Sequence, residues 1–291
     1  MPHLSDSRER KGGRAIIALL LTVLALSAGV LALAKPSWLP LDDRTKIGLE
    51  RWQRRLRADL DLPMPGQPDL ARLSQRLADA GVAEGAPILL RIYKKEFELE
   101  LWMQQAGKFK RFAVYPICRW SGRLGPKLQQ GDAQAPEGFY TVDQSALNPN
   151  SRWHRSFNLG YPNLFDQSHG RTGSLIMVHG GCASIGCFAM TNAQIDEIWQ
   201  LVTAALNGGQ KRFQVQVFPF RMTDAAMANA ENRADAAFWR DLKAGSDLFE
   251  TSFVPPKPML CEGRYRFEPG EAGSKGDAAI ETRCPGQPAK S

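Results

Sequence analysis

A basic segment at the start of the chain runs directly into an apolar one. Residues 15–34 hold no charged side chain, and four basic residues precede them: Arg8, Arg10, Lys11 and Arg14. A helix that crosses a bilayer needs about 20 residues, whereas the apolar core of a cleaved signal has roughly 7–15. The run therefore favours an uncleaved membrane anchor. A signal peptide cleaved near Ala32–Ala34 is the close alternative, and the adjoining basic head disfavours a buried core helix.

On either interpretation, the rest of the chain is exported across the membrane. Flanking positive charge stays on the cytoplasmic side, so residues 1–14 form a cytoplasmic head and residue 35 onward lies across the membrane. The net charge of +7 raises the question whether the protein binds nucleic acid. Much of the excess follows the apolar run, where anionic lipid or wall polymer explains it as well. No nucleic-acid motif accompanies this charge, so we expect no nucleic-acid partner.

Residues 35–85 are predicted to form a helical stalk. Leu49, Trp52, Leu56 and Leu60 recur at helical spacing with arginines between them. Prolines then interrupt the pattern, Asp69 is placed to cap a second short helix, and Gly81 is placed to end it. A stalk or packing extension is the simplest interpretation of both helices.

From residue 86 to 220 the pattern predicts a β-rich α+β domain. Ile88–Tyr93 is a compact strand candidate, and apolar residues alternate with Glu96, Glu98 and Glu100 in the next segment, which predicts a half-buried strand. Short strand-like runs recur at Phe139–Val142, Leu175–Val178 and Phe213–Phe218. No strand followed by a glycine-rich turn and a helix occurs, so a nucleotide-binding fold is excluded.

The C-terminal part is predicted to be helical first and disordered last. Thr191 and Gln194 fit a capping box before an apolar helical stripe, which Gly208 ends. Residues 221–269 are expected to form a helical extension. Glycine, proline and charge dominate residues 270–291, which predicts a disordered tail.

The chain has five cysteines, Cys118, Cys182, Cys187, Cys261 and Cys284. In an exported, oxidising compartment an odd number leaves at least one thiol unpaired within the chain. Spacing alone does not give the connectivity. Two bridges and one free thiol would suit an exported cysteine enzyme.

Chemistry-bearing residues are densest at 179–190, HGGCASIGCFAM. His179 ends an apolar strand, Gly180 allows a sharp turn, and Cys187 stands ahead of a predicted helix start. A histidine within reach can take the thiol proton, a helix N-terminus can favour the thiolate, and glycines let backbone N–H groups approach a reacting carbonyl. This arrangement suits acyl transfer. The alternatives are a zinc site of His179, Cys182, Cys187 and Cys118, a Cys182–Cys187 disulfide, and plain core cysteines.

His179-Gly180 followed by Ser184-x-Gly186-Cys187 resembles the signature of the L,D-transpeptidase (YkuD-type) family of cell-wall enzymes. Further stretches are similar to a proteobacterial branch of that family, which includes an amidase that detaches a lipoprotein from peptidoglycan. These stretches are 115–118, 121–127, 136–140, 156–163, 185–187 and 189–191. The resemblance covers about residues 88–220.

The resemblance implies a YkuD-type β-sandwich catalytic domain with flanking helices and no cofactor or metal. It implies Cys187 as the nucleophile and His179 as its base, with Ser184, Gly186 and Gly180 shaping the site. The donor would be a peptidoglycan stem peptide, attacked at the L-centre carbonyl of its third residue. An amine acceptor would make a cross-link, whereas water would make the enzyme a carboxypeptidase or amidase. The catalytic domain would face the periplasm.

Two further residues are candidates for the substrate cleft. Tyr140 and His154 could line it, although a core tyrosine and a loop histidine are common alternatives. The resemblance also suggests a Cys118–Cys182 bridge, because each cysteine lies in a family-like stretch. Cys261 and Cys284 would then remain as the second pair.

The chain departs from the family signature in two residue types and in a short spacing. Ile185 stands where a histidine is usual, and Phe188-Ala189 stand where an arginine soon follows the cysteine. The missing arginine removes a natural partner for a substrate carboxylate, and Arg119, Lys127 and Arg152 are the candidates to replace it. The departures favour the amidase-like branch, with a wall-attached lipoprotein as a partner. A non-catalytic wall-binding module and a metal-bound structural domain are the alternatives.

Overall fold

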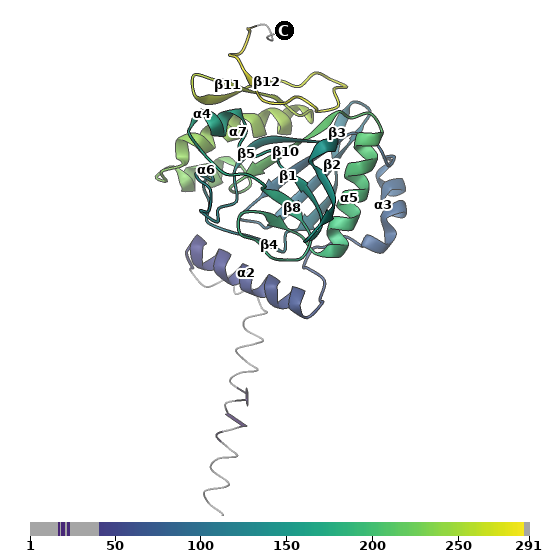
Figure 1. Cartoon of the computed structure of the whole chain (residues 1–291), viewed down its shortest axis with the longest axis vertical. Coiled ribbons are helices and arrows are strands. Elements are labelled where there is room, and N and C mark those ends of the chain that lie inside the picture. Colours follow the sequence, from purple (N-terminus) through teal and green to yellow (C-terminus); the bar gives the residue numbers. More distant parts are fainter. Residues whose placement is uncertain (1–16, 18, 21, 24–40, 288–291) are drawn as a thin grey trace, which may run out of the picture. The chain divides into compact units, whose positions relative to one another are not determined.

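A computed structural model of the chain describes residues 17, 19–20, 22–23 and 41–287 (Figure 1). Contacts divide the chain into two units, Met1–Gln53 and Arg54–Ser291, with the boundary inside helix α2 (Asp43–Asp59). None of the described helices is long and apolar enough to cross a membrane. The predicted head lies outside the described residues, and so does most of the predicted membrane segment, residues 15–34.

The first sheet of the second unit has five strands in the order β3-β2-β1-β10-β5. The central strand β1 (Ile88–Tyr93) is parallel to β10 (Arg212–Phe218), and every other pair is antiparallel. The remaining strands are β2 (Glu98–Gln105), β3 (Lys108–Pro116) and β5 (Gly138–Asp143). All residues of β1 are buried, which is typical of a strand covered on both faces.

Strand β2 differs from the half-buried strand that its alternation predicted. Glu100, on the face expected to be exposed, is buried. Its carboxylate accepts hydrogen bonds from the Trp102 indole (2.9 Å) and from the guanidinium groups of Arg111 and Arg221 (2.9 Å each). These partners compensate the loss of solvent, so both faces of the strand are covered. Arg111 lies on the neighbouring strand β3 and Arg221 is 121 positions away, and the alternation pattern reveals neither contact.

The second sheet has the strand order β4-β9-β8-β7-β6. Its strands are β4 (Arg119–Trp120), β6 (Leu147–Ser151), β7 (His154–Asn158), β8 (Met177–His179) and β9 (Phe188–Ala189). Only β8 and β9 run parallel. Helix α5 (Asn192–Asn207) contacts β1 of the first sheet and β7 of the second. The prediction of a β-rich chain with helices is thus confirmed as a mixed α/β fold.

Helix caps that the sequence predicted are present. Thr191 and Gln194 form the capping box of α5, which ends before Gly208. Asp69 accepts the Ala71 amide ahead of η1 (Leu70–Arg72), and Gly81 ends α3 (Leu73–Ala80) in the left-handed conformation. The remaining helical elements are η2 (Gln144–Ala146), α4 (Leu164–Ser168), α6 (Asp224–Ala230) and α7 (Ala236–Ser252).

The C-terminal part contains more structure than its composition predicted. The expected helical extension also holds the hairpin of β11 (Lys257–Cys261) and β12 (Arg264–Glu268), which β13 (Glu281–Thr282) joins as a third strand. Residues 270–287, expected to be disordered, pack on the domain: the Gln210 and Gln214 side-chain amides donate to backbone carbonyls of this segment. A Cys261–Cys284 disulfide also holds it. These contacts require few apolar residues, so a composition rich in glycine, proline and charge wrongly predicted disorder.

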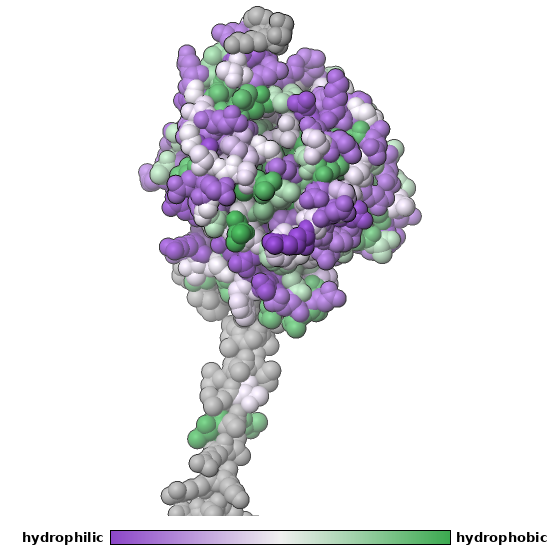
Figure 2. Space-filling view, in the orientation of Figure 1, coloured by the Kyte–Doolittle hydropathy of each residue, from purple (hydrophilic) through white to green (hydrophobic). Residues whose placement is uncertain are grey.

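The hairpin β11–β12 completes the core of the domain. Tyr265 of β12 is buried, and its ring stacks on Phe165 with centroids 4.1 Å apart. Its hydroxyl accepts hydrogen bonds from Asn163 Nδ2 (2.8 Å) and from the Phe139 amide (3.3 Å). Residues beyond 220 therefore contribute directly to the domain. On the face that Figure 2 shows, hydrophilic side chains cover most of the surface and apolar ones are scattered among them.

Replacing Tyr265 with phenylalanine should lower the free energy of unfolding by about 1–3 kcal/mol, because Asn163 and Phe139 lose a buried acceptor. Urea unfolding of the two proteins measures this difference. Tyr93→Phe is the matched control, since Tyr93 is a buried residue whose hydroxyl makes no hydrogen bond with the described part of the chain. That variant should be neutral or more stable. Equal losses at both positions would contradict the assignment.

Candidate active site

The strands of the second sheet present alternating rows of side chains. Paired residues of neighbouring strands face the same side, and successive residues face opposite sides. One row, which we call the core row, is fully buried and apolar: Phe157, Val178, Phe188 and Trp120, each 0% exposed. The next row, the histidine row, is Ser156, His179, Ala189 and Arg119. Cys187 directly precedes β9, and its Sγ lies beside Met177 of β8, two residues before His179.

Cys187 is the unpaired cysteine of the chain. Its Sγ accepts a hydrogen bond from the Met177 amide (3.4 Å) and lies 3.7 Å from the Leu175 carbonyl oxygen, to which the thiol can donate. Burial raises the pKa of the thiol, while the Met177 amide and the charge of Lys127 oppose that rise. The resting group is therefore a neutral thiol at neutral pH.

The position of Cys187 relative to the helix differs from the prediction. Strand β9 follows Cys187 directly, and α5 begins only at Asn192 with Thr191 as its cap. The helix N-terminus acts over about one turn, and here a strand separates it from the thiol. The helix N-terminus therefore does not stabilise an ionised form of the Cys187 thiol.

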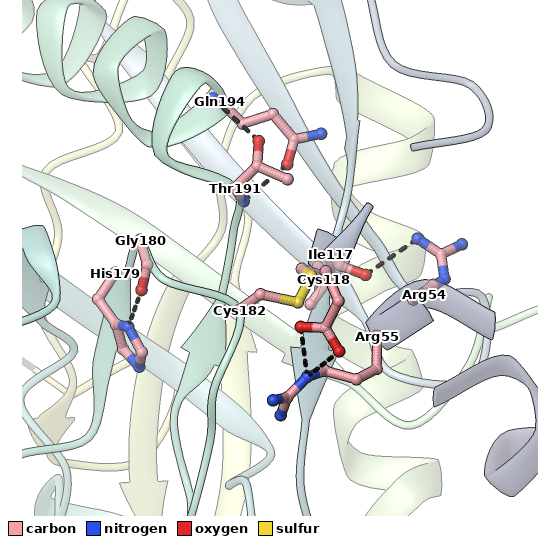
Figure 3. The surroundings of a disulfide bond; sticks show 10 residues. Arg54, Arg55, Ile117, Cys118, His179, Gly180, Cys182, Thr191 and Gln194 are labelled. Atoms are coloured by element: carbon pink, nitrogen blue, oxygen red, sulfur yellow. Dashed lines mark hydrogen bonds and ion pairs between the residues drawn. A yellow bond between two sulfur atoms is a disulfide. The ribbon is translucent and has the colours of Figure 1, made fainter. Parts of the chain in front are cut away.

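His179 ends β8, and its ring is 3% exposed. Nδ1 lies 2.5 Å from the Gly180 carbonyl oxygen, an acceptor, so Nδ1 must carry the proton (Figure 3). Nε2 then holds the lone pair and can act as a base. Burial lowers the pKa of the imidazole against the opposing effect of the Gly180 carbonyl, which keeps the ring neutral. Within the described structure His179 and Cys187 share no hydrogen bond.

Hydrogen bonds of the Ser184 hydroxyl hold the turn that leads into Cys187. Its hydroxyl donates to the Cys187 carbonyl (2.6 Å), accepts from the Gly186 amide (3.3 Å) and lies 3.2 Å from Ser121 Oγ. Gly186 has a φ of +132°, a conformation that side chains rarely adopt. A Cβ at Gly180 would lie 2.6 Å from Asn192 Oδ1, so only glycine fits there. All three predicted residues thus shape the loop, and their oxyanion role stays a prediction.

The structure does not bring Tyr140 or His154 to the thiol. Tyr140 is 2% exposed, and its hydroxyl contacts the Glu137 carbonyl and the Asp166 carboxylate (3.1 Å each), so it is a core residue. His154 Nε2 contacts Asp196 Oδ1 at 2.8 Å. Its position on β7 lies beyond His179 and away from the Cys187 end of β8. The burial of Tyr140 contradicts its predicted place in the cleft, whereas the cleft role of His154 stays a prediction.

A disulfide joins Cys118 to Cys182 and thereby ties the loop before Cys187 to the start of β4 (Figure 3). Arg54 Nη1 donates to the carbonyl of Ile117, the residue before this bridge (2.9 Å). A second disulfide joins Cys261 to Cys284. Both pairs are those that the family resemblance suggested. They also contradict two alternatives, since a zinc site would need Cys118 and Cys182 as thiolates and a Cys182–Cys187 bridge would need Cys182.

A fully buried ion pair holds the segment between β4 and β5, residues 121–137, in place. Lys94 Nζ donates to Glu137 Oε1 (2.8 Å) and to the Gly125 and Ala135 carbonyls. Glu137 Oε2 accepts from the Trp239 indole (2.8 Å). Removing one member of such a pair costs about 3–5 kcal/mol, so the segment has one fixed shape.

The same segment carries Ser121 and Lys127 toward the site. Lys127 Nζ is held by Asp132 (2.5 Å) and the Gln129 carbonyl (2.9 Å), and its charge acts on the Cys187 thiol. The sequence named Lys127 only as a candidate to replace the missing arginine, and it did not single out Ser121. Their only signal was the family-like stretch that contains both residues, at 121–127.

Comparison with known proteins identifies the domain. The family model of the YkuD L,D-transpeptidase catalytic domain matches residues 98–217. The chain is 46% identical over 181 residues to "Putative L,D-transpeptidase YafK" of Escherichia coli strain K12, covering 62% of this chain and 74% of that protein. The protein of the same name in E. coli O157:H7 matches equally.

Two solved structures are more distantly alike. The helical cell shape determining protein Pgp2 from Campylobacter jejuni has a TM-score of 0.39 and 22% identity, covering 60% of this chain and 65% of that one. Bd1075 of Bdellovibrio bacteriovorus has a TM-score of 0.34 and 17% identity, covering 56% and 60%. This chain thus spans less than two thirds of the length of either structure.

Removing the Cys118–Cys182 bridge, as Cys118→Ala/Cys182→Ala, should cost about 2–5 kcal/mol of unfolding free energy and speed the alkylation of Cys187 by iodoacetamide. The loop before Cys187 loses its covalent tie to β4 and opens the thiol to reagent. Cys261→Ala/Cys284→Ala is the matched control, with lost stability but unchanged alkylation. Equal alkylation rates in both double variants would contradict the role of the first bridge.

The pH dependence of Cys187 alkylation should have its midpoint above the usual thiol range, because burial raises the pKa of this thiol. In urea the same cysteine should be alkylated with a lower midpoint, since the unfolded thiol is solvated. Rates measured from pH 5 to 10 in both states, by intact mass, test this order. A plateau near neutral pH in the folded protein would instead show a resting thiolate–imidazolium pair.

Proposed function

Because this chain belongs to the L,D-transpeptidase (YkuD) catalytic-domain family, we propose that it is a cysteine acyltransferase acting on peptidoglycan stem peptides. The observation that carries the proposal is the unpaired Cys187 beside strand β8, whose last residue, His179, has its Nδ1 held by the Gly180 carbonyl. A free thiol and a base of fixed tautomer are the two groups that covalent acyl transfer requires.

The proposed reaction starts from two neutral groups. As the donor binds, Cys187 Sγ attacks the L-centre carbonyl of the third residue of the stem peptide, and the thiol proton passes to His179 Nε2. The tetrahedral intermediate collapses by breaking the C–N bond, and the leaving amine takes that proton. The products are a thioester on Cys187 and a free amine. An acceptor amine or water then attacks the thioester, loses a proton to His179 and restores the thiol.

The buried surroundings of His179 support its role as base. An imidazole whose pKa is lowered is unprotonated at neutral pH, so it is ready to receive the thiol proton. The Gly180 carbonyl then stabilises the imidazolium that forms, because it already faces the Nδ1 proton. This is the part that a carboxylate plays in a serine protease triad, taken here by a backbone oxygen.

A second proposal within the same chemistry is an amidase that releases a wall-attached lipoprotein. Ile185, next to the nucleophile loop, is 87% exposed, and Leu175, whose carbonyl faces the thiol, is 67% exposed. Exposed apolar residues beside a reactive group favour contact with another polypeptide. In this case the leaving amine would belong to a protein, and water would resolve the thioester.

We also propose that the catalytic domain works outside the cytoplasm, at the periplasmic side of the inner membrane or free in the periplasm. Two disulfides support this proposal, because such bonds persist in oxidising compartments. The anchor itself, residues 15–34, is proposed from the sequence alone.

Incubating the full chain with a carbapenem or with a stem tetrapeptide should give a covalent adduct on Cys187 by intact mass. Cys187→Ala should give none, and His179→Ala should form it at least about 100-fold more slowly, because the thiol loses its base. Ser121→Ala is a folded comparison that keeps both groups. No adduct on the wild-type chain with either reagent would overturn the proposal.

Analysis of wall fragments distinguishes the two activities. Purified wall treated with the wild-type chain should gain cross-links between third residues if an amine is the acceptor. It should release bound protein if water is the acceptor. The Cys187→Ala chain is the control in both assays.

A further inference from the structure

A partly exposed indole ring lies beside His179. Trp153 belongs to the two-residue turn between β6 and β7, and its ring centroid is 6.0 Å from that of the His179 imidazole. A Cβ built on Gly181 would lie 3.1 Å from Trp153 Cε3, so the indole packs on the backbone that follows His179. Trp153 nevertheless keeps 42% of its surface exposed. One part of the ring therefore covers the active-site turn, and another part is accessible to a ligand.

Contacts with helix α5 fix the turn that carries this indole. Asp196 of α5 contacts His154 Nε2 and accepts a hydrogen bond from Arg155 Nε, both at 2.8 Å. The Trp153 amide donates to Ser151 Oγ at 3.2 Å, which closes the turn on its other side. The residues before and after the indole are thus held in place, and a binding group on a fixed support can discriminate between ligands by their shape.

The strand register gives the order of three groups along the second sheet. Strands β7 and β8 are antiparallel, with Ser156 opposite His179. Cys187 Sγ lies beside Met177, two residues before His179. Trp153 comes three residues before Ser156, so it lies beyond His179, where its contact with the backbone after His179 also places it. His179 therefore lies between the thiol and the indole.

This order matches the order of groups along the substrate of the proposed reaction. The carbonyl of the donor is attacked at Cys187, and the leaving amine takes a proton from His179. The chain attached to that amine continues away from the carbonyl, and hence past His179 toward Trp153. An acceptor amine that gives its proton to His179 enters along the same path, because its attack reverses the departure of the leaving amine.

The surroundings of the indole favour a neutral, apolar chain. Arg152 Cζ lies over the Trp153 ring, 5.5 Å from its centroid, and Arg152 forms no ion pair with the described residues. A second cation beside this guanidinium is disfavoured, so a neutral amine is preferred to an ammonium group. Methylene groups that pack on the aromatic surface are removed from water, which stabilises the complex. A primary amine on an unbranched methylene chain meets both conditions.

We propose that Trp153 binds the chain that carries the leaving or acceptor amine and selects amines on unbranched methylene chains. This proposal rests on the proposed acyl transfer. The amine lies at His179 and its methylenes lie along the accessible part of the indole, so the length of the chain determines how much of the ring is covered. Such an amine ends the side chain of a protein lysine and that of a diamino acid in a second stem peptide.

Four donor peptides test the contact with the methylene chain. Each carries, on the L-centre carbonyl of its third residue, the amide of ethylamine, propylamine, butylamine or pentylamine, which are amines of nearly equal basicity. With the full chain in excess, the rate of amine release should rise about 2- to 4-fold for each added methylene. With Trp153→Ala the rate should be nearly constant across the series, and Trp153→Phe should retain part of the rise.

Trp52→Ala is the matched control, because Trp52 is a half-exposed indole on helix α2. This variant should keep the wild-type dependence on chain length. Unchanged melting and unchanged alkylation of Cys187 by iodoacetamide show that the variants are folded. The dependence on chain length compares four amines on one protein, so a partly unfolded sample still reports it.

Two further donors distinguish the sources of the amine. One is linked to the side-chain amine of Nα-acetyl-lysine amide, and the other to the side-chain amine of a diamino acid in a stem tripeptide. Trp153→Ala should slow the release of both about 10-fold or more, since each places several methylenes on the ring. The donor that the wild type cleaves faster identifies a protein or a stem peptide as the source.

The outcomes separate the role of Trp153 from the proposed function. A wild-type chain that forms no Cys187 adduct and releases no amine overturns the proposed function, and the role of Trp153 with it. A wild type that forms the adduct but releases none of the four amines, or releases them at rates independent of chain length, overturns the role of Trp153 alone. So does an unchanged dependence in Trp153→Ala, or a loss in that variant that is equal for all four amines.

Discussion

The parallel pairing of β8 with β9 is the constraint on which the rest of the site depends. It aligns Val178 with Phe188 in the core row and His179 with Ala189 in the histidine row. A slip of one residue would exchange the two faces and move Val178 and Phe188 out of the core row. Burial of the core row therefore fixes the side of the sheet that His179 faces.

Several kinds of constraint then converge on the short loop between His179 and Cys187. The Cys118–Cys182 bridge is covalent, the Ser184 hydroxyl contributes hydrogen bonds, and Gly180 permits a close approach that a side chain would block. A loop held only by its own backbone would sample many conformations, and a nucleophile needs one. The buried Lys94–Glu137 ion pair likewise holds residues 121–137 in one conformation, and this segment carries Ser121 and Lys127.

The electrostatics of the site favour proton transfer on demand over a preformed ion pair. Burial raises the pKa of the Cys187 thiol and lowers that of the His179 imidazole, so both groups rest neutral. The helix that follows is too far along the chain to help, because β9 intervenes. In the proposed reaction, charge develops only when a carbonyl is attacked, and the Gly180 carbonyl, which faces Nδ1 of His179, would stabilise the imidazolium. A neutral resting thiol is also less prone to oxidation in an oxidising compartment.

Local sequence patterns were enough to single out Cys187 and His179 as the proposed nucleophile and base and to find the helix caps. A strand end, a glycine turn and a capping box each depend on only a few consecutive residues. Local patterns failed where distant segments meet. Glu100 is buried against arginines from two other segments, Tyr140 lies in the core, and the C-terminal segment is held by a disulfide and side-chain amides. The same limit hid the relation between Ala189 and Arg119, which are 70 positions apart in the chain yet directly paired. Pairing between strands is set by the burial of whole faces, so the residues that share a face with Cys187 emerge only when the sheet has formed.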